Sequence, residues 1–183
     1  MCQYVIDHDG LVVRLAAAAG RGVNVRITLD NTNFKDSSCS RQPERLRSLY
    51  DAGVRMRTLK LKLSRGSFAC MHSKMVLYDS DTVTLGSANW THNGFEFNKE
   101  HVVRIISSPL NIQCAEDFEN VWSGCAIVDR DRVEEACRLK EERVAKRAEQ
   151  QAALRRSRSL EVESKTTSTT TTRASKSGGA VAM

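Results

Sequence analysis

Two successive helix–strand pairs, followed by a series of apolar strands, predict an α/β fold with a mixed β-sheet flanked by helices. The first pair occupies residues 9–29 and the second residues 43–58, and both are rich in apolar residues. Three further apolar segments of strand length follow at 71–78, 82–87 and 100–106. Helices and strands that each carry an apolar face pack against one another in layers, so this order of elements favours helices on a sheet.

The first pair follows a short apolar start. Residues Met1–Ile6 have the composition of the end of a strand. Either the domain starts abruptly here or an upstream segment belongs to it, and we expect the second. Asp7 or Asp9 can cap a helix that Gly20–Gly22 ends, because aspartate favours helix starts and glycine favours helix ends. Residues 23–29 alternate aliphatic and polar side chains, which predicts a strand.

The second pair begins after a polar segment, residues 30–40, which predicts a loop. Pro43 fits the first turn of a helix that Gly53 ends. The next strand begins at Val54, where apolar and polar residues alternate again.

The remaining apolar segments predict a β-hairpin and one further strand. The segments 71–78 and 82–87 are joined by a short acidic turn, and Gly86 allows a close approach of another backbone. A further strand is expected at 100–106, and Ser108 then opens a helix whose apolar residues lie on one face.

The composition changes after residue 128 and divides the chain into three parts. Residues 1–128 form a domain with enough apolar residues for a core. Residues 129–158 are rich in Glu, Arg, Lys and Ala and predict a charged helical extension. Residues 159–183 are dominated by Ser, Thr, Lys and Gly, which predicts a disordered tail because this composition buries too little apolar surface to fold.

The composition also limits the classes of function. The net charge is +6 and the pI is about 9.1, which favours an anionic partner such as a nucleic acid or an acidic membrane surface. No apolar run is long enough to span a bilayer. The cysteines lack zinc-finger spacing, so we interpret them as free thiols in a reducing compartment; they are Cys2, Cys39, Cys70, Cys114, Cys125 and Cys137.

A basic segment precedes the strand at 71–78. Residues 52–78 contain no acidic residue, and a solvated strand edge would explain any one of their basic residues. Their concentration before His72 favours a second interpretation, in which they steer an anionic substrate to the site. The substrate-steering candidates are Arg55, Arg57, Lys60, Lys62 and Arg65.

Four polar residues near the hairpin form a candidate catalytic site. His72 and Lys74 lie two residues apart and would share one face of a strand. His72 can attack phosphorus or act as a base, and Lys74 supplies positive charge. The amide of Asn89 can donate to phosphoryl oxygens, and Glu100 can fix the tautomer of the histidine. Because no carboxylate cluster is available for magnesium or calcium, we expect a reaction that needs no metal and no cofactor.

Each of these residues has an ordinary structural explanation when taken alone. A strand histidine is usually structural, and a lysine or a Gly-Ser pair is common at surfaces and turns. Together they form the pattern H-x-K, four residues, D, six residues, G-S-x-N. At residue frequencies of about 5%, a chance match in a chain of this length is roughly one in several hundred thousand.

The pattern resembles the HKD signature of the phospholipase D superfamily. The segments GSANWT and FNKEHVVRI resemble its single-motif branch, which contains Nuc-type endonucleases and mitochondrial cardiolipin hydrolases, also called Zucchini-type proteins. The resemblance covers about residues 1–125 and implies a phospholipase D-like half-domain. The cysteine-rich zinc element of some animal relatives is not evident here.

The resemblance implies a role for each matched residue. His72 matches the nucleophile, Lys74 and Asn89 match the phosphate-binding pair, and Glu100 matches the acid that orients the histidine. The supporting residues are Asp79, Gly86 and Ser87, of which Asp79 has a structural role at the turn.

The resemblance also implies partners and substrates. Two histidines are needed for the reaction and the chain has one motif, so a homodimer that shares the active site is expected. The substrate would be a phospholipid such as cardiolipin or a single-stranded RNA or DNA, with peripheral contact to an anionic membrane. We expect an intracellular protein, at the mitochondrial surface if an anchor precedes this sequence. The alternative from another class is a non-catalytic anion-binding module.

Overall fold

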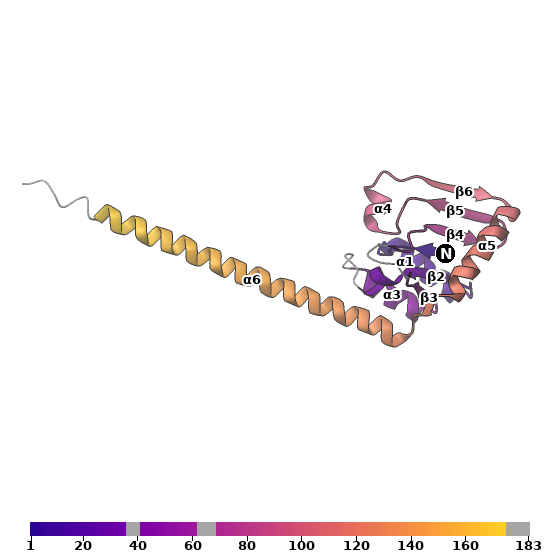
Figure 1. Cartoon of the computed structure of the whole chain (residues 1–183), viewed down its shortest axis with the longest axis horizontal. Coiled ribbons are helices and arrows are strands. Elements are labelled where there is room, and N and C mark those ends of the chain that lie inside the picture. The colour runs from indigo at the N-terminus through magenta and orange to yellow at the C-terminus, as the bar shows by residue number, and fades with distance from the viewer. Residues whose placement is uncertain (36–40, 62–68, 175–183) are drawn as a thin grey trace, which may run out of the picture. The chain divides into compact units, whose positions relative to one another are not determined.

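A mixed β-sheet forms the centre of the protein. The computed structural model describes residues 1–35, 41–61 and 69–174 of the chain. Within these residues the sheet has seven strands in the order β6-β5-β4-β1-β2-β3-β7 (Figure 1). The strands are β1 (Cys2–Gln3), β2 (Arg26–Asp30), β3 (Arg55–Leu59), β4 (Met75–Tyr78), β5 (Thr82–Gly86), β6 (Val102–Ile106) and β7 (Ala126–Ile127).

The strand directions are both parallel and antiparallel. β1, β2 and β3 run parallel, whereas β4 pairs with β1 in the antiparallel sense. The register of the β4–β5 hairpin pairs Met75 with Leu85, and continuing it places Gly86 opposite Lys74. The predicted α/β class with a mixed sheet is therefore confirmed.

Helices cover both faces of the sheet and divide the core in two. One apolar cluster, which includes Ile27, Leu29 and Met56, packs between the sheet and helices α1 and α3. The other, which includes Val83 and Phe118, packs between the sheet and α5. The helices are α1 (Asp9–Gly20), α2 (Asn31–Lys35), α3 (Gln42–Asp51), α4 (His92–Glu96), α5 (Ser108–Ser123) and α6 (Arg130–Ala174).

Three local predictions were wrong. The cap of α1 is His8, whose Nδ1 accepts from the backbone N–H of Leu11 at 3.2 Å, and not Asp7 or Asp9. The segment expected to be a loop after β2 contains α2, since the Asp30 carboxylate accepts from the N–H of Asn33 and caps this short helix. The strand expected from residue 71 begins only at Met75.

The chain divides into two compact units, Met1–Lys140 and Glu141–Met183, and the boundary falls within α6. In the first unit, Val133 and Cys137 are buried, and Arg130 forms an ion pair with Asp51. The helical backbone continues to Ala174, beyond residue 158, where the sequence predicts its end. Among the described residues, no helix combines the length and the apolar composition needed to cross a bilayer.

Candidate active site

His72 and Lys74 lie in an irregular segment that leads into β4. Because Cys2 pairs with Met75 in an antiparallel register, this segment runs beside the end of β1. The exposed ring of His72 contacts the ring of Tyr4, with centroids 4.9 Å apart. Lys74 is only 8% exposed, and its Nζ donates to the backbone carbonyl of His72 at 2.7 Å. An exposed imidazole and a buried ammonium are thus held close together on a segment of three residues.

Asp30 anchors the segment that carries His72. This side chain is 3% exposed, and its Oδ2 accepts from the backbone N–H of Met71 at 3.0 Å. Its Oδ1 accepts from the N–H of Asn33 at 2.9 Å. Sequence reasoning missed this residue, although a carboxylate at the end of an apolar strand was a signal that could have drawn attention to it. Asp30 therefore fixes the backbone next to the candidate nucleophile.

Burial changes the acid–base behaviour of Lys74. Desolvation lowers the pKa of its ammonium below the usual value, while the charges of Cys70 and Glu100 act in the opposite direction. Lys74 can therefore lose its charge at a lower pH than an exposed lysine would.

Glu100 is held in a small hydrogen-bonded group. Its Oε2 accepts from the Ser87 hydroxyl at 2.5 Å, and its Oε1 accepts from the Asn98 amide at 3.0 Å. The backbone N–H of His101 in turn donates to the Ser87 hydroxyl at 3.1 Å. The hydrogen bond from Ser87, and to a smaller extent that from Asn98, lowers the pKa of Glu100 and so favours its ionised form. The contacts described for Glu100 do not include His72, so its orienting role stays a prediction.

Asn89 follows β5 and is fixed by its neighbours. The next residue, Trp90, forms a parallel bridge with Ile6 just after β1. The Oδ1 atom of Asn89 is buried without a hydrogen-bond partner among the described residues. A buried amide oxygen without a partner is uncommon, because it loses the hydrogen bonds that water would give it. This amide therefore has unused hydrogen-bonding capacity.

A cavity of about 200 Å³ adjoins Lys74. Trp90 and Phe95 contribute apolar walls, and Gly86 lies on the adjacent strand. A Cβ at Gly86 would lie 2.4 Å from the carbonyl oxygen of His101, so only glycine permits this approach of β5 and β6. The space beside the buried ammonium is therefore mainly apolar.

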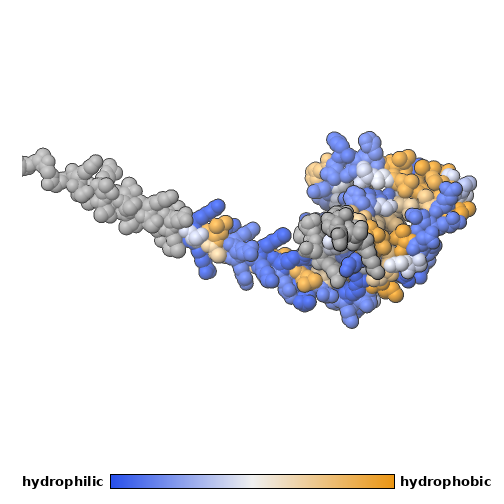
Figure 2. Space-filling view, viewed as in Figure 1, coloured by the Kyte–Doolittle hydropathy of each residue, from blue (hydrophilic) through white to orange (hydrophobic). Residues whose placement is uncertain are grey.

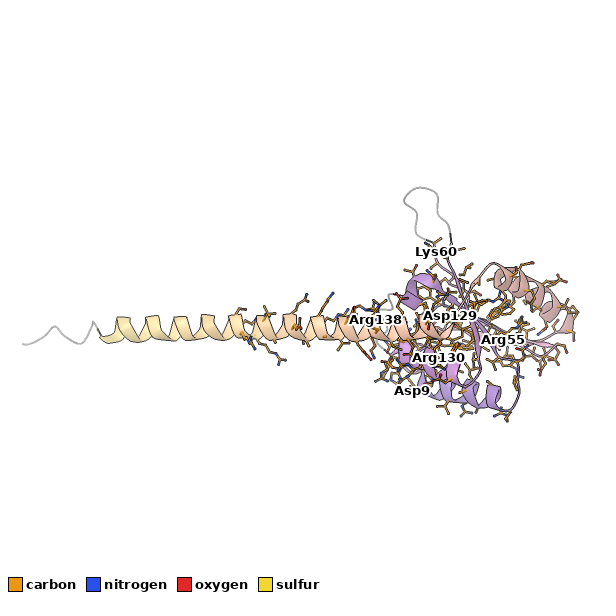
Figure 3. All side chains as sticks on the ribbon, turned by 90° about the horizontal axis from the view of Figure 1, so that it is seen from below. Asp9, Arg55, Lys60, Asp129, Arg130 and Arg138 are labelled. Carbon is orange, nitrogen blue, oxygen red and sulfur yellow. The ribbon has the colours of Figure 1, made fainter. Side chains whose placement is uncertain are left out.

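The structure brings only part of the basic segment to this side of the sheet. β1 and β3 are both parallel to β2, so Lys60, which follows β3, lies at the same end of the sheet as His72. Arg55 begins β3 and lies at the opposite end, where it donates to Asn24 (Figure 3). Arg57 donates to the carbonyl of Trp122 at 2.8 Å and stacks on its ring. Two further steering candidates, Lys62 and Arg65, lie outside the described residues.

Asp79 lies away from these groups. It occupies the turn between β4 and β5, at the other end of the hairpin from Lys74. Its φ of 49° is in the left-handed region, which aspartate tolerates better than most residues. Asp79 therefore shapes the turn.

Apolar side chains remain exposed at the β6 edge of the sheet. Val102 and Ile106 on this edge strand are 56% and 74% exposed, and Phe97 in the preceding loop is 70% exposed. Figure 2 shows hydrophobic surface interspersed with polar surface on the folded domain. An edge strand with this composition offers a surface for another chain.

The sequence matches a known family over most of the folded domain. Residues 1–122 match the family described as cardiolipin synthase, PLD-like domain. A mitochondrial cardiolipin hydrolase from Xenopus laevis is 29% identical over 122 residues, which cover 67% of this chain and 53% of that protein. Cardiolipin synthase 2 from Bacillus anthracis is 26% identical over 129 residues, covering 70% of this chain and 24% of that protein.

Solved structures have the same fold. Nuc from Salmonella typhimurium, a phospholipase D family member, aligns with a TM-score of 0.61 and 24% identity, covering 70% of this chain and 79% of that chain. NucT from Helicobacter pylori aligns with a TM-score of 0.62 and 23% identity, covering 69% of this chain and 79% of that chain. The chain spans about half the length of the curated hydrolase that it matches. With a family match over residues 1–122, the chain belongs to the cardiolipin synthase, PLD-like domain family.

Proposed function

We propose that this protein is a metal-independent phosphodiesterase of the phospholipase D type that acts through a phosphohistidine at His72. The observation that carries the proposal is the pairing of an exposed imidazole with a buried ammonium on a segment anchored by Asp30. A fixed nucleophile beside a fixed positive charge suits attack on a phosphate diester.

The reaction has two displacements. An imidazole nitrogen of His72 attacks phosphorus, and the bond from phosphorus to the leaving oxygen breaks while that oxygen takes a proton from a second histidine. Water then attacks the phosphohistidine, gives a proton to the second histidine, and releases the phosphate monoester and His72. Lys74 and the Asn89 amide hold the phosphoryl oxygens, and Glu100 orients an imidazole.

The second histidine would come from another copy of the chain. A homodimer with His72 of the partner subunit across a two-fold axis supplies one attacking and one protonating imidazole. The exposed Val102 pairs with Gly86, so the start of the β6 edge lies at the same end of the hairpin as Lys74 and supports a self-association surface near the site.

The substrate that we favour is a phospholipid such as cardiolipin. The mainly apolar cavity beside Lys74 supports this choice, since acyl chains need apolar contacts. Relatives are named mitochondrial cardiolipin hydrolases, and we extend that substrate and a mitochondrial association to this chain. The second candidate is an endonuclease on single-stranded nucleic acid, which the fold of Nuc and the exposed Lys60 support.

The test compares the purified protein on cardiolipin vesicles and on labelled single-stranded RNA and DNA, with a chelator present. We expect hydrolysis of cardiolipin that His72→Asn abolishes, while His101→Asn, which changes an exposed side chain just before β6 and leaves its backbone N–H in place, keeps the activity of the wild type. Cleavage of nucleic acid without hydrolysis of cardiolipin would support the endonuclease and contradict the phospholipid substrate. Absence of hydrolysis of every diester, including a small chromogenic one, would favour the non-catalytic anion-binding module.

A further inference from the structure

Three side chains beside the candidate active site take no part in the proposed reaction. They are His8, which precedes α1, and His92 and Glu96, which lie one turn apart on α4. One nitrogen or oxygen atom from each lies within 4.8 Å of the others. We propose that this His–His–Glu cluster binds a divalent cation of the zinc class.

The backbone already brings the two parts of the cluster together. The carbonyl of Trp90 accepts from the N–H groups of Asp7 and His8 at 2.9 and 3.1 Å. The N–H of His92 donates to the Asp7 carboxylate at 2.8 Å. Segments that are more than 80 residues apart in the sequence are thus fixed before any ion arrives, which lowers the entropic cost of binding.

One of the ligand–ligand distances already suits tetrahedral coordination. Zinc bonds of about 2.0–2.2 Å place neighbouring ligand atoms roughly 3.4 Å apart. The Nε2 of His8 and the Oε1 of Glu96 are 3.5 Å apart. The ring of His92 is exposed and stacks beside His8 with centroids 6.4 Å apart, so rotation about its side-chain bonds brings in the third ligand.

The donor set and its surroundings favour zinc over magnesium or calcium. Two imidazoles and one carboxylate match the ligands of zinc and its transition-metal neighbours, whereas magnesium and calcium prefer oxygen ligands. The ring of Phe95 lies 4.9 Å from that of His8, and the ring of Phe97 lies 5.3 Å from that of His92. These rings give the ion an apolar side, which strengthens its attraction to Glu96.

Ion binding competes with the cap of α1. In the structure Nδ1 of His8 accepts from the N–H of Leu11, so a neutral His8 carries its proton on Nε2, facing Glu96. Coordination through Nε2 replaces that proton and requires a proton on Nδ1, which can no longer accept. Zinc should therefore release the Leu11 N–H while it links α4 to the segment before α1.

The test is a calorimetric titration of the chelator-treated full chain with Zn²⁺, together with the visible spectrum of the Co²⁺ form. We expect one ion per chain with a dissociation constant on the order of 10⁻⁶ M. Loss of a residue that only supports a metal ligand typically weakens metal binding by about 10-fold or more. His92→Ala and Glu96→Gln each remove a proposed ligand itself, so each should weaken Zn²⁺ binding by at least about 10-fold. His101→Ala removes an exposed histidine outside the cluster and should leave the affinity unchanged.

A matched variant separates ion binding from helix capping. His8→Asn keeps a capping acceptor but loses the imidazole, so it should fold like the wild type and bind Zn²⁺ at least about 10-fold more weakly. In the wild type, Zn²⁺ should accelerate hydrogen exchange of the Leu11 amide. Absence of saturable binding by the wild type, or unchanged affinity in His92→Ala and Glu96→Gln, would overturn the proposal. Activity is not measured, so the result is independent of the proposed function.

Discussion

At the scale of single residues, the main feature of the candidate site is the burial of one charged side chain, the Lys74 ammonium. Lys74 is 8% exposed, and its pKa is lowered mainly by burial, so keeping its charge has a cost in free energy. The nearby Glu100 carboxylate reduces that cost, since opposite charges favour each other. A phosphate diester would add a second negative charge at the same place.

This arrangement predicts how activity depends on alkaline pH. Because the pKa of Lys74 is depressed, its charged form is lost at a lower pH than that of an exposed lysine, and activity should fall in that range. Lys74→Arg keeps its charge at every accessible pH, so the alkaline fall should move to higher pH, while the maximal rate drops by about 10-fold or more because the guanidinium has another shape.

The measurement is the pH dependence of kcat for wild type, Lys74→Arg and Lys99→Arg. Lys99 is exposed and serves as the matched control, whose profile should equal that of the wild type. An alkaline limb that stays in place in Lys74→Arg would assign the titration to another group.

At the scale of elements, the candidate site depends on contacts between distant segments. The segment before β4 is attached to the end of β2 through Asp30 and Met71, which are 41 residues apart. The loop after β5 is attached to the segment after β1 through Trp90. The site therefore forms only when the sheet has assembled.

Asp30→Asn tests the first of these attachments. Both carboxylate oxygens of Asp30 accept from backbone N–H groups, and asparagine replaces one of them with an NH₂ group that cannot accept. The lost hydrogen bond should lower the free energy of unfolding by about 1–3 kcal/mol. Turnover should also fall, because the backbone beside His72 loses its anchor. Thermal unfolding and cardiolipin hydrolysis measure the two effects.

The control for this variant is Asp51→Asn, which removes the negative charge of an exposed partner of Arg130 and should cost less than about 1 kcal/mol. If Asp30→Asn were as stable and as active as the wild type, Asp30 would have no anchoring role.

These attachments also explain what the sequence could and could not predict. The alternation around Ile27 and the glycine at position 53 are local signals, and they predicted β2 and the end of α3. The pattern from His72 to Asn89 predicted the candidate site because its spacing is local too. The His8 cap, α2 and the anchoring by Asp30 depend on geometry or distant partners that periodicity does not reveal.

At the scale of the whole molecule, the β6 edge is the surface through which we expect a second copy to associate. This strand has a free edge in the described part of the chain and carries Val102 and Ile106 with more than half of their surface exposed. Apolar residues at an open edge favour association, whereas charges oppose it.

Ile106→Glu should therefore weaken the proposed dimer. A charge on this exposed side chain should leave the fold intact, convert the dimer to monomer, and reduce hydrolysis because the second histidine is lost. Sedimentation velocity and the hydrolysis rate measure both effects on the same sample. Ile127→Glu, on the edge strand at the other side of the sheet, is the matched control. A fully active monomer would contradict the shared site.

The lengths of the two strands in the β4–β5 hairpin account for the residue spacing of the H-x-K…D…G-S motif. The four residues between Lys74 and Asp79 are the whole of β4, and the six between Asp79 and Gly86 complete the turn and bring the chain back opposite Lys74. Adding one residue to either strand would turn Lys74 or Gly86 to the opposite face, beneath α5. During divergence, insertions in this hairpin should therefore occur two per strand or not at all.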